Sequence, residues 1–236
     1  MAGWNRIGLT LATVASISGS AYPAGPSPNA GQAAATFVPA RLLDGPLPVT
    51  PSPNVVGRIE ETLEVMVDAT GGVAQMTPVR ASPLPADLVV PAVARWRFQP
   101  ALDQGRMVPS RVLVSAIFRP PQLDNSPTLG DPPVDLAAPS DGVPVPIVTE
   151  MPLYPPVAIN EGVVLVEVLV GVDGRVRQPR IVASAAGFDQ AALDAAGRWS
   201  FRPARWNGSA VEAYAYLVFG FRRPVVVGPP PRSPGR

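Results

Sequence analysis

The chain carries one sequence pattern twice. Residues 95–101 read RWRFQPA and residues 198–204 read RWSFRPA, so the two tryptophans are separated by 199 − 96 = 103 positions. Upstream, Val67-Asp68 matches Val172-Asp173 at 172 − 67 = 105, which we interpret as a turn two residues longer in the first copy. Two copies of one fold tolerate insertions in turns. Two copies are also too few for a stacked solenoid, so the repeat predicts two separate small domains.

The composition excludes most catalytic chemistry. The chain has no His, Cys or Lys, and all 19 cations are Arg. Without these residues there is no usual zinc or haem site, no Ser-His or Cys-His nucleophile and no Schiff-base lysine. The 18 acidic residues are scattered, and the net charge of +1 gives no field for nucleic acid. We therefore predict a non-enzymatic protein with no metal, no cofactor and no nucleic-acid partner.

The ends of the chain and the region between the copies have a different composition. Residues 1–21 combine Arg6, a short apolar stretch and a run of small residues, which predicts a cleaved signal peptide and a periplasmic protein. An uncleaved anchor in the inner membrane, or a terminus that stays in the cytoplasm, are the alternatives. We expect residues 22–48 to form a Pro/Ala/Gly-rich lead, 122–150 an extended Pro/Asp-rich linker and 225–236 a Pro-rich tail.

Each copy, at residues 49–121 and 151–224, is predicted to fold in the order strand, strand, helix, strand, strand. In the second copy, residues 163–172 alternate as a strand does, Asp173-Gly174 is typical of a tight hairpin turn, and residues 188–199 have helical spacing with Asp189 as the N-cap. In the first copy Pro91 should delay or disturb the helix. The predicted class is α+β, with one helix packed across an antiparallel sheet in each domain.

Aromatic residues mark the predicted core and a candidate binding edge. We expect Trp96 and Trp199 to anchor the two cores. On the last strand, one face carries small and aromatic residues that belong under the helix, while Tyr214, Tyr216 and Val218 face outward. If this strand is a sheet edge, it can accept a partner strand. The alternative is that the tyrosines cover the solvent face or pack on the segment around Tyr154.

The second copy resembles the C-terminal domain of the TonB energy transducers. The resemblance covers about residues 151–222 and lies in three elements, Tyr154-Pro155, Val172-Asp173-Gly174-Arg175-Val176 and Trp199-Ser200-Phe201-Arg202-Pro203-Ala204. The first copy, at about residues 49–119, looks like a diverged version, with Val49-Thr50 where Tyr154-Pro155 would be.

The resemblance implies a periplasmic module that binds an extended segment of an outer-membrane TonB-dependent receptor by strand addition. It also implies energy-coupled transport of a nutrient or siderophore, with inner-membrane motor subunits as further candidate partners. The partner-binding candidates are Tyr154, Pro155, Tyr214, Tyr216 and Val218. Tyr154-Pro155 has a second interpretation, as a staple that holds an extended lead against the sheet. A structural or scaffolding envelope protein without a transport role is the alternative function, and homodimerisation is left open.

Overall fold

The computed structural model describes residues 37–52, 58–82, 88–118 and 133–223. The predicted signal peptide at 1–21 and the tail at 225–236 lie outside the described residues. In the first half the elements are β1 (Phe37–Val38), β2 (Arg41–Asp44), β3 (Ile59–Val67), β4 (Val73–Ala81), α1 (Val90–Val93), β5 (Arg97–Gln99), β6 (Ala101–Asp103), β7 (Arg106–Val108) and β8 (Ser110–Phe118). In the second half they are β9 (Val134–Asp135), β10 (Val145–Val148), β11 (Gly162–Val170), β12 (Val176–Ala183), α2 (Asp189–Gly197), β13 (Ser200–Arg202), β14 (Ala204–Trp206), β15 (Ser209–Val211) and β16 (Ala213–Phe221).

The two repeats correspond at a constant offset, and the predicted insertion is wrong. Strands β3 and β11 both have nine residues and begin 162 − 59 = 103 positions apart. In the turns that follow, the Phe98 N–H donates to the Gly71 carbonyl and the Phe201 N–H to the Gly174 carbonyl, each at 2.8 Å. Gly71 is therefore equivalent to Gly174, and the Val-Asp pairs do not correspond. Both glycines have positive φ, and a Cβ on either would lie 1.9 Å from the facing carbonyl oxygen.

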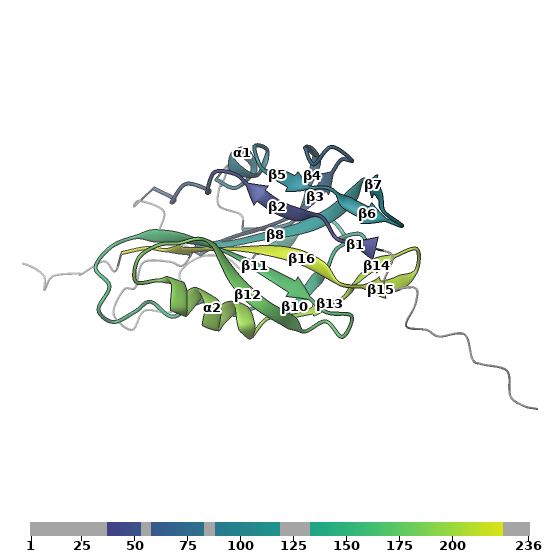
Figure 1. The fold of residues 1–236 in the computed structure, drawn as a ribbon. Coiled ribbons are helices and arrows are strands. Elements are labelled where there is room, and N and C mark those ends of the chain that lie inside the picture. Colours follow the sequence, from purple (N-terminus) through teal and green to yellow (C-terminus); the bar gives the residue numbers. More distant parts are fainter. Residues whose placement is uncertain (1–36, 53–57, 83–87, 119–132, 224–236) are drawn as a thin grey trace, which may run out of the picture. The chain divides into compact units, whose positions relative to one another are not determined.

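Strands of both repeats form one sheet, which corrects the expectation of two separate sheets. Among the described residues its order is β12-β11-β16-β8-β3-β4-β9. Strands β8 and β16 pair in parallel, with Leu113 opposite Ala215 and Phe118 opposite Gly220, and the other neighbours in the sheet are antiparallel. The structure is thus α+β as predicted, mostly antiparallel, with the repeats joined at the β8·β16 seam (Figure 1).

The two repeats cover opposite faces of this sheet. Helix α1 and strand β5 lie on one face, named here the α1 face, and helix α2 and strand β13 lie on the other, the α2 face (Figure 1). The equivalent residues Phe118 and Phe221 belong to the α1-face and α2-face cores respectively. At the seam Phe118 lies opposite Gly220, which is one position before Phe221, the equivalent of Phe118. Because side chains alternate along a strand, this single-residue displacement lets equivalent residues face opposite sides.

The tryptophans anchor the cores as predicted. Trp96 is fully buried and Trp199 is 2% exposed. Their indole N–H groups make equivalent bonds of 2.9 Å, from Trp96 to the Pro46 carbonyl and from Trp199 to the Glu150 carbonyl. Each repeat therefore holds the chain that leads into it with the same contact.

The helices agree with the predictions except at the predicted N-cap. Helix α1 is only four residues long and has Pro91 in its first turn, which confirms a late start. Helix α2 begins at Asp189, and Phe188 stands at the N-cap position without a side-chain cap. The Asp189 carboxylate instead accepts hydrogen bonds from the Ser184 hydroxyl at 2.6 Å and the Ala185 N–H at 3.0 Å. The prediction of Asp189 as the N-cap is thus wrong by one residue.

Parts of the predicted lead and linker are ordered strands. Strand β10 lies in the expected linker and pairs with β13, and β2 lies in the expected lead and pairs with β5. Val143, also in the expected linker, is fully buried. Within residues 133–150 the prediction of an extended spacer is therefore wrong. Short apolar stretches between the prolines pack against the rest of the fold, and β10 pairs with β13.

Candidate functional site

The predicted free edge of the last strand does not exist in this fold. Strand β16 pairs with β11 along one side and with β8 along the other. Tyr216 and Val218, expected to face solvent, are both 0% exposed because the first repeat covers the α1 face. The condition for strand addition at β16, that this strand is a sheet edge, is therefore not met, since both of its hydrogen-bonding sides are occupied.

The two tyrosines of β16 take part in a packed polar cluster under β2. The Tyr216 hydroxyl accepts a hydrogen bond of 2.6 Å from the Leu42 N–H, and burial raises the pKa of this phenol far above its usual value. Glu167, which is 3% exposed, accepts hydrogen bonds from Arg41 at 2.9 Å and from Arg180 at 3.1 Å. The bond to Glu167 raises the pKa of Arg41.

Tyr214 is partly buried at the edge of this cluster. The Arg41 guanidinium lies 5.4 Å from the centre of the Tyr214 ring, a cation–π contact. These contacts join the first repeat to the second on the α1 face. A partner-binding role for Tyr214, Tyr216 or Val218 stays a prediction, and in this fold their contacts are made within the chain.

Tyr154 and Pro155 lie on the opposite face of the sheet. The Tyr154 ring packs edge-on against Phe188 at 5.6 Å, and its hydroxyl donates to the Asn160 carbonyl at 2.6 Å. Partial burial raises the pKa of Tyr154. The structure therefore does not bring the five predicted site residues together, because Tyr154 packs with the α2-face core and Tyr216 with the α1-face core.

Beside Tyr154 lies a shallow groove, named here the α2 groove. Its volume is about 420 Å³, and it is lined by a Pro-rich stretch, by Gly187 and by residues of α2: Leu153, Tyr154, Pro155, Pro156, Gly187, Gln190, Ala191 and Asp194. Leu153 in this lining is largely exposed, and so are Val157 and Ile159, which follow it closely in sequence. Contiguous exposed apolar side chains are typical of protein-contact surfaces.

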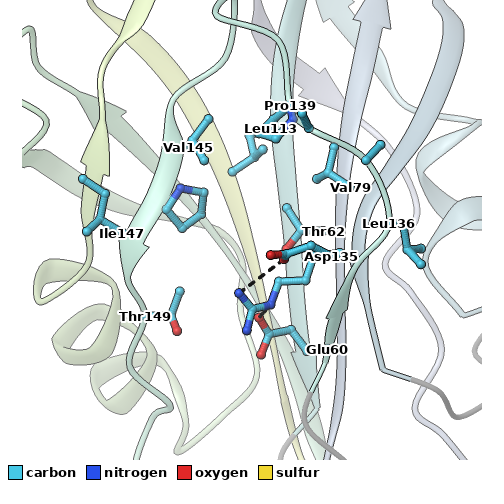
Figure 2. A pocket seen from close by; sticks show the side chains of 14 residues that line it. Glu60, Thr62, Val79, Leu113, Asp135, Leu136, Pro139, Val145, Ile147 and Thr149 are labelled. Atoms are coloured by element: carbon cyan, nitrogen blue, oxygen red, sulfur yellow. Dashed lines mark ion pairs between the residues drawn. The ribbon is translucent and has the colours of Figure 1, made fainter.

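A larger groove of about 660 Å³, named here the β10 groove, lies on the α2 face beside the first repeat. Its floor is formed by β3, β4 and β8, and its two walls are β10 and the stretch 135–139 (Figure 2). Arg80 also lines the groove, with its guanidinium 3.3 Å from Glu60 and 3.7 Å from Asp135. Glu60 is 2% exposed and also pairs with Arg58, which does not line the groove.

Sequence reasoning missed the β10 groove entirely. It treated residues 122–150 as a spacer and assigned no site to the first strand of the first repeat. One usable signal was the alternation of Glu60, Thr62 and Glu64 on the first strand, because the equivalent positions of the second copy are Val163, Leu165 and Glu167. Glu60 and Thr62 line the groove, and Glu64 accepts hydrogen bonds from Arg111 and from the Ser140 N–H.

The described surfaces offer two grooves and no arrangement of side chains that sequence reasoning would assign to catalysis. Within the described ranges, no group of three or more acidic side chains is placed to hold a metal ion, and no helix is long and apolar enough to cross a membrane. Two grooves with apolar walls and few charges suit contacts with polypeptide chains.

Residues 150–222 match the family model described as the Gram-negative bacterial TonB protein C-terminal. The match supports a relation of the second repeat to the TonB C-terminal family, whose members are protein-interaction domains of the cell envelope. The match does not extend to the first repeat, whose membership of the family stays a prediction that rests on the shared element order. No curated protein sequence matches the chain.

Proposed function

We propose that this chain is a non-enzymatic periplasmic protein that binds an extended segment of an outer-membrane TonB-dependent receptor in energy-coupled transport. The observation that carries the proposal is the TonB C-terminal match over residues 150–222. The signal-peptide pattern of residues 1–21 supports the periplasmic location. Because β16 has no open side, the receptor contact is assigned to another surface of the second repeat.

The α2 groove and its exposed apolar neighbours are the surface that fits this role. Val157 is 91% exposed and Leu153 72%, although both are large apolar residues. Tyr154 and Pro155 stand between them, the tyrosine held by Phe188 and by its bond to Asn160. A surface whose side chains are already fixed loses little conformational entropy when a partner binds.

The proposal predicts that a charge on this surface weakens receptor binding. Val157→Asp should lower the affinity of the full chain for a synthetic peptide from a receptor's N-terminal segment by about tenfold, since the new carboxylate would be desolvated in an apolar contact. Isothermal titration of the wild-type and variant chains measures this difference. The side chain is almost fully exposed, so the variant should keep the melting temperature of the wild type.

Leu43→Asp is the matched control, because Leu43 is 66% exposed and lies in the first repeat. It should bind the receptor peptide as the wild type does. Equal weakening by both variants, or no binding by the wild-type chain, would reject the α2 groove as the receptor contact.

A second function, a scaffolding envelope protein with no transport role, is favoured by one observation. The edge of β16 that strand addition would use is filled by β8 of the same chain. A deletion strain separates the two functions: loss of receptor-dependent uptake supports transport, whereas normal uptake together with altered envelope integrity supports scaffolding.

A further inference from the structure

The same chain contains a segment whose chemistry suits the α2 groove. Residues 225–236, the predicted tail, read VVVGPPPRSPGR and lie outside the described residues. Three consecutive prolines favour the polyproline II helix. Proline-rich segments with two prolines three positions apart, as in Pro231-Arg232-Ser233-Pro234, bind to grooves lined by aromatic side chains.

The α2 groove has the aromatic wall that such a segment needs. The Tyr154 ring lines it beside two prolines, opposite Ala191 and Asp194 of α2. This ring is held in place by its edge-on contact with Phe188 and by the hydrogen bond from its hydroxyl to the Asn160 carbonyl. Both the ring and a polyproline II segment are therefore ordered before they meet, which lowers the entropy cost of their contact.

The groove also has a carboxylate that no cation neutralises. Asp194 is exposed, and its carboxylate accepts a hydrogen bond of 2.7 Å from the Gln190 amide. No arginine lines the groove, and within the described ranges Asp194 forms no ion pair. The tail carries Arg232 and Arg236 and no acidic residue, so it complements this charge without displacing an existing partner.

The described part of the chain stops beside the same groove. Tyr154 is bonded to Asn160, and the next residue, Glu161, accepts a hydrogen bond of 3.2 Å from the N–H of Arg223, the last described residue. The segment from Arg223 to Arg232 spans up to about 28 Å in polyproline II geometry. It is therefore long enough to cross a groove of about 420 Å³.

We propose that residues 229–236 dock in the α2 groove of their own molecule as a polyproline II segment, with the prolines on the Tyr154 ring and Arg232 paired with Asp194. This contact goes beyond the proposed receptor binding. It makes the tail a competitor for any partner of the groove. Because the tether keeps the tail at an effective concentration of about 1 mM, even a weak contact fills the groove for most of the time.

Fluorescence anisotropy with a labelled peptide of residues 225–236 tests the proposal on full-length chains. One chain is the wild type, and the other, the tail-disabled chain, carries Pro230→Gly, Pro231→Gly and Arg232→Ser. The tail-disabled chain should bind the peptide about tenfold more tightly, because the tail of the wild type occupies the groove. Equal affinity of the two chains, or no binding to the tail-disabled chain, would overturn the proposal.

Substitutions in the tail-disabled chain locate the contact. Asp194→Asn should weaken peptide binding by about threefold, the scale of an exposed ion pair. Its side chain is exposed, so the variant should keep the melting temperature of its parent. The matched control is Glu212→Gln, which removes an exposed carboxylate outside the lining and should leave the affinity unchanged.

A double-mutant cycle identifies the arginine. A peptide with Arg232→Gln should lose about threefold in affinity for the tail-disabled chain, but nothing further when that chain also carries Asp194→Asn. Unchanged binding by Asp194→Asn, or full additivity of the two losses, would overturn the pairing of Arg232 with Asp194.

The tail contact and the receptor contact can fail separately. If the receptor segment uses the α2 groove, the tail-disabled chain should also bind the receptor peptide about tenfold more tightly than the wild type. Binding of the tail peptide without binding of the receptor peptide would keep the tail contact and reject the receptor contact. The reverse result would overturn the tail contact and leave the receptor contact in place.

Discussion

At the scale of single residues, Tyr216 was predicted to bind a partner, but its side chain makes buried contacts within the chain. Its phenol is buried, accepts from the Leu42 N–H at 2.6 Å, and its pKa is raised chiefly by desolvation. In the unfolded chain the phenol ionises near its ordinary value of 10.0, whereas in the folded protein it stays protonated at higher pH. The folded state therefore binds more protons above that pH, and its stability falls as pH rises.

We expect the free energy of unfolding to drop by about 1.4 kcal/mol per pH unit above pH 10 through this residue. Denaturant unfolding of the wild type and of Tyr216→Phe between pH 8 and about 11 measures the difference. The variant should lose about 1–3 kcal/mol at neutral pH, because the buried Leu42 N–H loses its acceptor. Its stability should then depend less on alkaline pH than that of the wild type. Parallel pH profiles for the two chains would contradict this account.

At the scale of elements, the β8·β16 seam depends on a glycine. A Cβ at Gly220 would lie 2.1 Å from Cδ1 of Phe118, whose ring is fully buried across the seam. Gly220→Ala should therefore destabilise the protein by about 1–3 kcal/mol, through overpacking of the α1-face core. Thermal unfolding of the single variant checks this value.

A double variant separates overpacking from other effects of the alanine. Phe118→Ala removes the ring that the new methyl group of Gly220→Ala would contact. The double variant should therefore lose less unfolding free energy than the sum of the losses in the two single variants. Strict additivity would mean that the alanine acts elsewhere than at the Phe118 ring.

The same elements show what sequence reasoning could and could not predict. The hairpin strands, the tryptophan cores and the inward face of β16 followed from side-chain period. The place of the turn at Asp173-Gly174 was also predicted, but the connection spans residues 171–175 between Val170 and Val176, and of the two turn residues only Gly174 has positive φ, so the tight two-residue form is wrong. The pairing of β8 with β16 could not be predicted, because no local sequence feature determines which strand edges pair with one another. A signal was present in the uncharged run of Ala213–Phe221, which is apolar on both faces and typical of a strand covered on both sides. The β10 groove was also missed, because both of its walls lie in the predicted linker at 122–150.

At the scale of the whole molecule, the shared sheet joins the repeats into one cooperative structure. Leu165, Tyr216 and Val218 of the second repeat lie in the α1-face core together with residues of the first repeat. Residues 150–223 expressed alone should therefore expose this apolar face and form oligomers or aggregates, whereas residues 37–223 should unfold in one calorimetric transition.

Light scattering coupled to size-exclusion chromatography, together with scanning calorimetry, measures both properties. A monomeric second repeat that unfolds cooperatively at the temperature of the longer chain would contradict the shared core and restore two independent domains.

The position of β16 also has a consequence for the order in which the chain is made. Among the described residues it is the last strand of the sheet in sequence, yet it lies between β11 and β8. Until the ribosome has synthesised it, β8 keeps an unpaired edge beside two apolar faces, and neither core can close. The cores of both repeats therefore depend on residues 213–221, so a chain that stops before them would leave apolar surface of both repeats exposed.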